Sequence, residues 1–251
     1  MQVGLEAVVD PRGFALDSPA AKTVRKAVHR VQRHGWTVEV VRAADLDLAL
    51  TLRISAVEAA WRRRHRRLYG FAWAGDRLWG APEDTRDVYA LARNPAGELR
   101  AFQRYVPYRR GLSLDAMRRL DDEPNGIADS LVAAVLEYAR AHGCEEVSLN
   151  FSAFGHLMAA DTLERRSHRV ARWALRRLHR RFQLERLARF TAKFGPAWRP
   201  RYLVYTRRTR LPLAALRIMQ AEAYLRPPRR RLVPQAWLPA PLPIRPPLVT
   251  R

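Results

Sequence analysis

The sequence predicts an α/β fold built on a mixed sheet, because strand-like and helix-like stretches alternate along the chain. Short runs rich in Val, Leu and aromatic residues are separated by segments whose apolar residues recur every three or four positions. Glycine and proline stand at many of the junctions. With 251 residues, of which 48% are hydrophobic, the chain is long enough to bury a sizeable core.

Each expected element has a local reason. Ser18 and Pro19 suit the start of the first helix and Gly35 its end, with apolar residues repeating at helical spacing between them. Apolar runs joined by the turn sequence NPAGE predict a hairpin. Gly143 suits the end of a later helix. Strands are expected over 3–10, 36–41, 87–93, 99–108, 145–154 and 201–206, helices over 18–35, 46–68, 128–143, 161–189 and 211–225, and loops over 70–84 and 112–126.

Charge is the most unusual feature of the composition. The 46 Lys and Arg against 24 Asp and Glu give a formal net charge of +22, which favours polyanionic partners such as nucleic acid or an anionic membrane. No apolar run reaches the length of about 18 residues typical of a membrane span, and the first residues do not resemble a signal peptide. We therefore expect a cytoplasmic protein whose membrane contact is peripheral.

The sequence lacks the residues or motifs of several kinds of site. Cys144 is the only cysteine, so neither an intramolecular disulfide nor a cysteine-built metal site can form. The phosphate-binding, dinucleotide-binding and zinc-protease motifs are missing, and the seven histidines lack ligand spacing. We expect no metal and no cofactor.

The expected helix over 161–189 sets apolar residues among many arginines, a pattern typical of helices that lie on membranes or bind nucleic acid. The sequence does not divide these charges between lipid and RNA. The residues expected to face such a surface are Arg169, Arg172, Trp173, Arg176, Arg177 and Arg180.

A few polar residues are candidates for chemistry. Asp115 and Arg118, three apart in the expected 112–126 loop, could hold an ammonium and a phosphate or carboxylate, or form a local ion pair. Asn150 interrupts an apolar strand and suits either a site or a bulge. Lys193 is one of only three lysines in an arginine-rich chain, and is either a solvated cation or a positioned point charge.

Three blocks of sequence carry a resemblance: LRAFQRYVPYRRGLSLDAMRRLDDEPNGIADSL, VSLNFSAF and RFTAKFGPAWRPRYLVY. They resemble the C-terminal catalytic domain of the bacterial phosphatidylglycerol lysyltransferases and alanyltransferases, nearest to the actinobacterial forms fused to a lysyl-tRNA synthetase. The resemblance implies a GNAT-like fold, with part of a first unit over 1–44 and a complete second unit over 45–225. Residues 226–251, rich in Pro and Arg, are expected to be a disordered tail.

The resemblance also implies an activity. Members of this family move an aminoacyl group from aminoacyl-tRNA to the glycerol hydroxyl of phosphatidylglycerol at the inner membrane leaflet, which protects the cell from cationic antimicrobial peptides. The group expected here is lysyl. The implied partners are aminoacyl-tRNA, phosphatidylglycerol and a separate membrane domain. The implied catalytic residues, expected in one cleft, are Asp115, Arg118 and Lys193, and the implied substrate-binding residues are Asn125, Asn150, Arg199 and Arg201.

Two departures keep alternatives open. The family's acidic residue before a Gly-Phe-Ser segment is absent, since Arg67 and Leu68 stand close before Gly70 and Phe71. The chain also begins midway through the first unit, as a fragment or a stand-alone paralogue would. The alternatives are a catalytically silent protein that binds RNA or membranes, and an aminoacyltransferase with a non-lipid acceptor. An acetyl-CoA enzyme is disfavoured, because QRYVPYRRG replaces the acetyl-CoA loop of GNAT enzymes.

Overall fold

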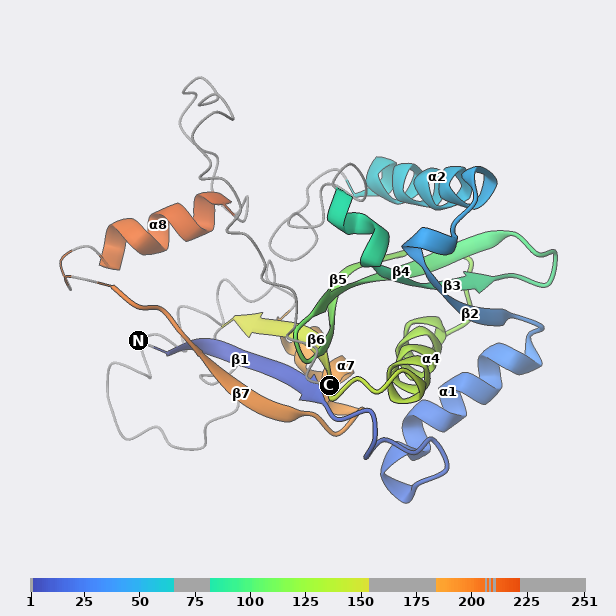
Figure 1. The fold of residues 1–251 in the computed structure, drawn as a ribbon, viewed down its shortest axis with the longest axis horizontal. Helices are drawn as coiled ribbons and strands as arrows, with labels where there is room; N and C mark the ends of the chain where they lie inside the picture. Colours follow the sequence, from blue (N-terminus) through green and yellow to red (C-terminus); the bar gives the residue numbers. More distant parts are fainter. Residues whose placement is uncertain are drawn as a thin grey trace, which may run out of the picture.

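A computed structural model of the chain describes residues 2–65, 82–153, 184–205, 207, 209 and 211–221. In this part of the chain, seven strands form one sheet in the order β2-β3-β4-β5-β6-β1-β7 (Figure 1). Neighbouring strands are antiparallel except β5 and β6, which are parallel. The strands are β1 (Gln2–Val9), β2 (Thr37–Arg42), β3 (Val88–Arg93), β4 (Leu99–Tyr108), β5 (Gly111–Arg119), β6 (Glu146–Ala153) and β7 (Ala197–Tyr202).

The helices lie on both faces of this sheet. One face is covered in part by α2, and the other by α1 and α4 (Figure 1). The helices are α1 (Lys22–Arg33), α2 (Leu48–Arg64), α4 (Ile127–Ala141), α7 (Leu184–Ala192) and α8 (Leu211–Ala221), with short 3-10 turns at Pro19–Ala21, Ala43–Asp45 and Pro82–Arg86. The expected α/β fold is confirmed.

Each face of the sheet buries its own apolar cluster. The larger cluster joins the sheet to α1 and α4, and the smaller one joins it to α2. Alternation along β3 sends Val88 and Ala90 into the larger cluster and Tyr89 and Leu91 into the smaller one. The two faces can therefore be told apart from the cluster that each side chain joins.

Strands from both sides of the expected boundary at residue 44 share the sheet. β1 lies between β6 and β7, and β2 pairs with β3. The division into units over 1–44 and 45–225 stays a prediction.

Most expected elements are present, and two expectations are wrong. The 112–126 segment is not a loop throughout, because Gly111–Arg119 forms β5. Buried Leu112, Leu114 and Ala116 alternate with more exposed residues, which is the period of a strand. The last strand spans Ala197–Tyr202 rather than 201–206. It contains Pro200, which is tolerated because β7 forms an edge of the sheet.

Some expectations fall outside the described residues. Of the helix expected over 161–189, only the last positions are described, and they belong to α7. The proposed surface arginines from Arg169 to Arg180, the segment around Gly70 and the tail all lie outside.

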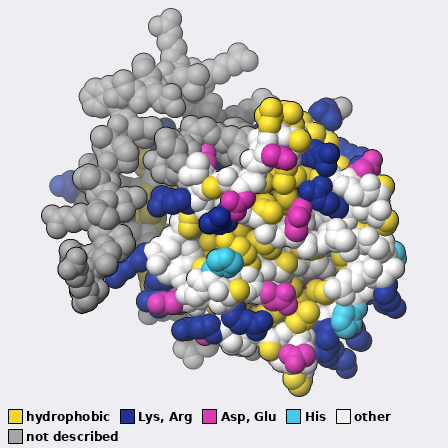
Figure 2. Space-filling model, turned by 45° about the vertical axis from the view of Figure 1, so that its right-hand side comes forward, with side chains coloured by type: hydrophobic (Ala, Val, Ile, Leu, Met, Phe, Trp, Pro, Cys, Tyr) yellow, Lys and Arg dark blue, Asp and Glu magenta, His cyan; other side chains and the backbone are white. Residues whose placement is uncertain are grey.

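In the part of the chain that is described, no helix is both long and apolar enough to span a membrane. Figure 2 shows basic side chains spread over one side of the molecule, with acidic side chains among them.

Candidate functional site

Strands β5 and β6 separate shortly after they begin. They pair only from Gly111 to Ser113 on β5 and from Glu146 to Ser148 on β6. Gly111 allows this contact, because a Cβ at that position would lie 1.8 Å from the Glu146 carbonyl oxygen. Side chains beyond the paired part therefore stand at a split between two strands.

Asn150 lies on β6 beside this split. Its φ of +80° is in the left-handed region, and it belongs to a bulge where the register between β6 and β1 shifts. Its Nδ2 donates a hydrogen bond to the Leu114 carbonyl oxygen of β5, at 3.3 Å. Asn150 thus occupies a bulge and bridges the split, while its role in substrate binding stays a prediction.

A second bulge places Asp115. On β4, Arg104 pairs with Ala116 and Tyr105 pairs with Leu114, so Asp115 is an extra residue in β5. In a regular strand, residues three apart point to opposite faces. The bulge instead lets Asp115 and Arg118 share the α2 face, where Asp115 approaches Arg104 and Arg118 reaches α2.

Asp115 belongs to a cluster of charges around buried Arg104. The guanidinium lies 2.5 Å from an oxygen of Asp87, 3.0 Å from Asp84 and 3.5 Å from Asp115. Burial raises the pKa of both Asp87 and Asp115, although the charge of Arg104 opposes the shift. The Asp115 side chain is 32% exposed, so a carboxylate more basic than an ordinary aspartate faces solvent here.

Arg118 is held differently. Its side chain is 1% exposed, its Nε lies 2.6 Å from Glu58 of α2, and its guanidinium lies 4.1 Å from the centre of the Trp61 ring. Burial lowers its pKa, against the opposing charge of Glu58. The pair fixes α2 against β5, and Arg118 itself is too buried to touch a substrate.

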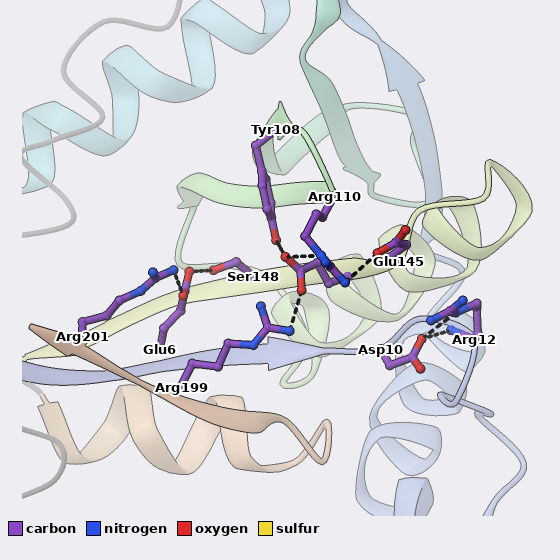
Figure 3. Close-up of polar contacts among 10 residues, drawn as sticks. Glu6, Asp10, Arg12, Tyr108, Arg110, Glu145, Ser148, Arg199 and Arg201 are labelled. Carbon is purple, nitrogen blue, oxygen red and sulfur yellow. Dashed lines mark hydrogen bonds and ion pairs between the residues drawn. The ribbon is translucent and has the colours of Figure 1, made fainter. Parts of the chain in front are cut away.

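Polar side chains from β1, β4, β6 and β7 gather on the face of the sheet that also carries Asp115 (Figure 3). Arg199 of β7 lies 2.6 Å from Glu146, which also accepts a hydrogen bond from the Tyr108 hydroxyl at 2.9 Å. Burial would raise the pKa of Glu146, but the hydrogen bonds from Arg199 and Tyr108 and the nearby positive charges lower it. Arg199 is therefore engaged with a carboxylate in this structure.

Arg201 forms the neighbouring contact. It pairs with Glu6 of β1, which also accepts a hydrogen bond from the Ser148 hydroxyl at 2.6 Å. Arg201 and Asp115 line the same cavity of about 390 Å³. The other lining residues are Glu6, Val106, Pro107, Tyr108, Ser113 and Leu114.

Lys193 lies on the opposite face. It follows α7, and its Nζ lies 2.7 Å from Oδ1 of Asp129 on α4. The next residue, Phe194, packs into the cluster beneath α1 and α4. The expectation that Asp115, Arg118 and Lys193 line one cleft is therefore wrong, because the sheet lies between Lys193 and the other two. Lys193 instead shares a pocket with Asn125.

The sequence reasoning missed Glu6, Arg104, Tyr108 and Glu146. A usable signal was present on β6, where Glu146 and Ser148 alternate with the buried apolar residues Val147 and Leu149. Within the described ranges, no group of three or more His, Cys, Asp or Glu side chains could hold a metal ion.

Several known proteins are similar to this chain in sequence. Residues 1–205 match the family model described as "Phosphatidylglycerol lysyltransferase, C-terminal". The lysylphosphatidylglycerol biosynthesis bifunctional protein LysX of Gordonia bronchialis is 32% identical over 239 residues, which cover 91% of this chain and 21% of that protein. LysX of Mycobacterium marinum is 33% identical over 233 residues, covering 90% and 20%. The chain spans about a fifth of the length of these curated relatives.

Two solved structures share the fold. L-PGS from Bacillus licheniformis aligns with a TM-score of 0.66 and 23% identity, over 88% of this chain and 66% of that one. The C-terminal domain of a putative lysylphosphatidylglycerol synthetase from Agrobacterium fabrum aligns with a TM-score of 0.69 and 24% identity, over 90% and 67%.

Proposed function

The chain belongs to the family of phosphatidylglycerol lysyltransferase C-terminal domains, and we propose that it transfers an aminoacyl group, lysyl foremost, from aminoacyl-tRNA to a glycerol hydroxyl of phosphatidylglycerol. The names of its relatives, which concern lysylphosphatidylglycerol synthesis, support this assignment. The observation that carries it is the partly exposed Asp115, which lines one cavity with Arg201 beside the split of β5 and β6.

The proposed reaction is a transesterification. The glycerol oxygen forms a bond to the ester carbonyl carbon, and the bond from that carbon to the ribose oxygen of the tRNA breaks. The proton lost by the glycerol hydroxyl ends on the ribose oxygen. Asp115 takes up this proton as general base, and its raised pKa suits the task because a stronger base accepts the proton more readily.

Two arginines and one asparagine support this step. Arg201, whose side chain is 55% exposed, attracts the lipid phosphate into the cavity. Arg118 is a positioning residue that acts through α2 and β5. Asn150 holds the split at Leu114, directly before Asp115.

We place the protein in the cytoplasm, at the inner face of the membrane. Large apolar side chains are exposed on β7 at Trp198 and Tyr202 and on α8 at Leu213 and Ile218, in the same part of the chain as Arg201. Such residues suit a shallow contact with lipid beside a phosphate-binding arginine. The expected partner that carries a separate membrane domain stays a prediction.

The test is transfer of labelled lysine from charged tRNA to vesicles that contain phosphatidylglycerol. Removing a general base costs about 10²-fold or more in rate, so Asp115→Asn should lower transfer by at least that factor. Asp45→Asn is the matched control, because Asp45 forms an exposed pair with Arg42 and does not line the cavity. Equal rates for Asp115→Asn and wild type would remove Asp115 from the mechanism. A wild-type protein that transfers nothing from any charged tRNA would support the silent binding protein instead.

A further inference from the structure

A second cavity lies on the face opposite Asp115. It has a volume of about 590 Å³ and is bounded by α1, the start of α4, the end of β5 and the residues around the end of α7. Four cations line it, namely Lys26, Arg30, Arg119 and Lys193. Asp129 is the one carboxylate among its lining residues, all of which are described.

Helix packing fixes the positions of these cations. α1 and α4 are in contact, and Gly126, directly before α4, stands against Ala27 of α1. Gly126 has a φ of +110°, and a Cβ there would lie 2.8 Å from the Ala27 Cβ, so only glycine fits without a shift. This approach brings Arg30 within 3.4 Å of the Asn125 carbonyl oxygen. The packing of α1 against the start of α4 therefore determines the shape of the cavity.

The charge of the cavity is only partly neutralised. Asp129 pairs with Lys193, and Arg119 interacts with the nearby Glu123 carboxyl, so the excess positive charge rests mainly on Lys26 and Arg30. Lys26, Arg30 and Arg119 are exposed residues, and α1 contains no acidic residue. A group that places several acceptor oxygens and negative charge among these donors, such as a phosphate, complements the cavity.

We propose that this cavity binds a backbone phosphate of the tRNA that carries the aminoacyl group, an inference that rests on the proposed function. RNA is favoured over a lipid surface because no large apolar side chain is exposed on α1 or α4, both of which are fully described. Binding to a membrane surface needs such side chains, whereas binding to an RNA backbone needs only the cations.

The position of the cavity constrains how this partner binds. β5 contributes Arg119 to the cavity and Asp115 to the opposite face, four residues earlier. Four residues of a strand span about 13 Å, and the sheet lies between the two side chains, so the 3′ end of a tRNA held at Arg119 would have to pass around the sheet to bring its ester to Asp115.

Binding of uncharged tRNA to the full chain tests the proposal. The variant Lys26→Ala/Arg30→Ala should bind tRNA at least about tenfold more weakly. The dependence of log affinity on log salt should also become shallower, by about 1 for each phosphate that the variant no longer neutralises. The control is Lys22→Ala/Arg33→Ala, which removes the same charge from exposed positions on α1 outside the cavity. It should bind tRNA less than about threefold more weakly.

Three outcomes separate the possible roles of the cavity. Equal losses in the two variants would reduce the effect to diffuse positive charge and overturn the proposal, as would unchanged tRNA binding in Lys26→Ala/Arg30→Ala. Weaker binding to phosphatidylglycerol vesicles, with tRNA binding intact, would assign the cavity to lipid. Arg119→Ala, which approaches the cavity from β5, should also weaken tRNA binding, even if the α1 variant misfolds. Because the probe is uncharged tRNA, the binding result can be interpreted even if the protein shows no transfer activity.

Discussion

The two faces of the sheet use charge in opposite ways. On the α2 face, Arg118 and Arg104 are buried and closely paired with carboxylates. On the α1 and α4 face, Lys26 and Arg30 are exposed around a cavity, and of the described cations that line it only Lys193 is paired with a carboxylate. Buried pairs are costly to break, whereas exposed cations contribute little to stability and remain available to a ligand. The first face therefore places its charges for structure and chemistry, and the second offers them for binding.

The largest expected effect tests the first half of this comparison. Arg118→Met would leave Glu58 buried with a weakened set of partners, in which Arg62 remains. Breaking a buried ion pair by removing one partner costs about 3 kcal/mol or more. We expect the free energy of unfolding, measured in denaturant, to fall by about that amount.

The control for this prediction is an exposed pair. Arg42 and Asp45 are 60% and 51% exposed, so Arg42→Met should change the unfolding free energy by less than about 1 kcal/mol. Similar losses in the two variants would mean that burial does not distinguish the α2 face.

The same contrast shows what the sequence could predict. Alternating apolar residues identified most strands, and helical spacing identified α1, α2 and α4, because these patterns are local. The face on which Asp115 lies was not predictable from its spacing to Arg118, since it depends on one bulge against β4. The partners of Arg118 and Lys193 are 60 and 64 residues away in sequence, so only the assembled fold shows that these side chains meet Glu58 and Asp129.

The family resemblance identified residues without giving their arrangement. Asp115, Arg118 and Lys193 were expected in one cleft because each lies in a block of sequence that resembles the family. The strands and helices that carry them place Lys193 on one face and Asp115 on the other. A motif match therefore gives no direct information on which face of a sheet a residue occupies.

Glu123 should have a smaller effect on stability. It is neither a buried paired charge nor an exposed cation, but a buried carboxyl. It lies between β5 and α4, and both of its carboxylate oxygens are buried without a well-oriented hydrogen-bond partner. Burial raises the pKa of this carboxyl to about 7. The folded state then binds more protons than the unfolded state between about pH 4.5 and 7, so stability is lost as the pH rises through this window.

Glu123→Gln should remove this loss. We expect the variant to gain about 1 kcal/mol at pH 8 and almost nothing at pH 4, less than the full pKa shift implies because the side chain is only partly buried. Unfolding curves at both pH values measure the difference. A variant that gains equally at pH 4 and pH 8 would show that the carboxyl is not titrating in this window.

The smallest expected effect concerns Lys193→Arg, and it tests the division between the two faces most directly. The Lys193 ammonium lies 2.7 Å from Asp129 and 5.3 Å from the centre of the Phe190 ring, and a guanidinium can keep both contacts. We expect a change of less than about 0.5 kcal/mol in unfolding free energy, as for Lys22→Arg on the exposed side of α1. Lys193 lies on the α1 and α4 face, where we propose that tRNA binds. We therefore expect kcat to be nearly unchanged and the KM for charged tRNA to rise by less than about tenfold.

A group that stabilises charge on the reacting ester would behave differently. Misplacing such a donor costs about 10²-fold in kcat. Lys193→Arg could lose that much in kcat while Lys22→Arg matches wild type. In that case Lys193 reaches the ester in the working complex, and catalysis is not confined to the face that carries Asp115. If instead only the KM for tRNA changes, the cation at position 193 acts with Asp129 in holding RNA, and Asp115 carries the proton transfer from the other side of the sheet.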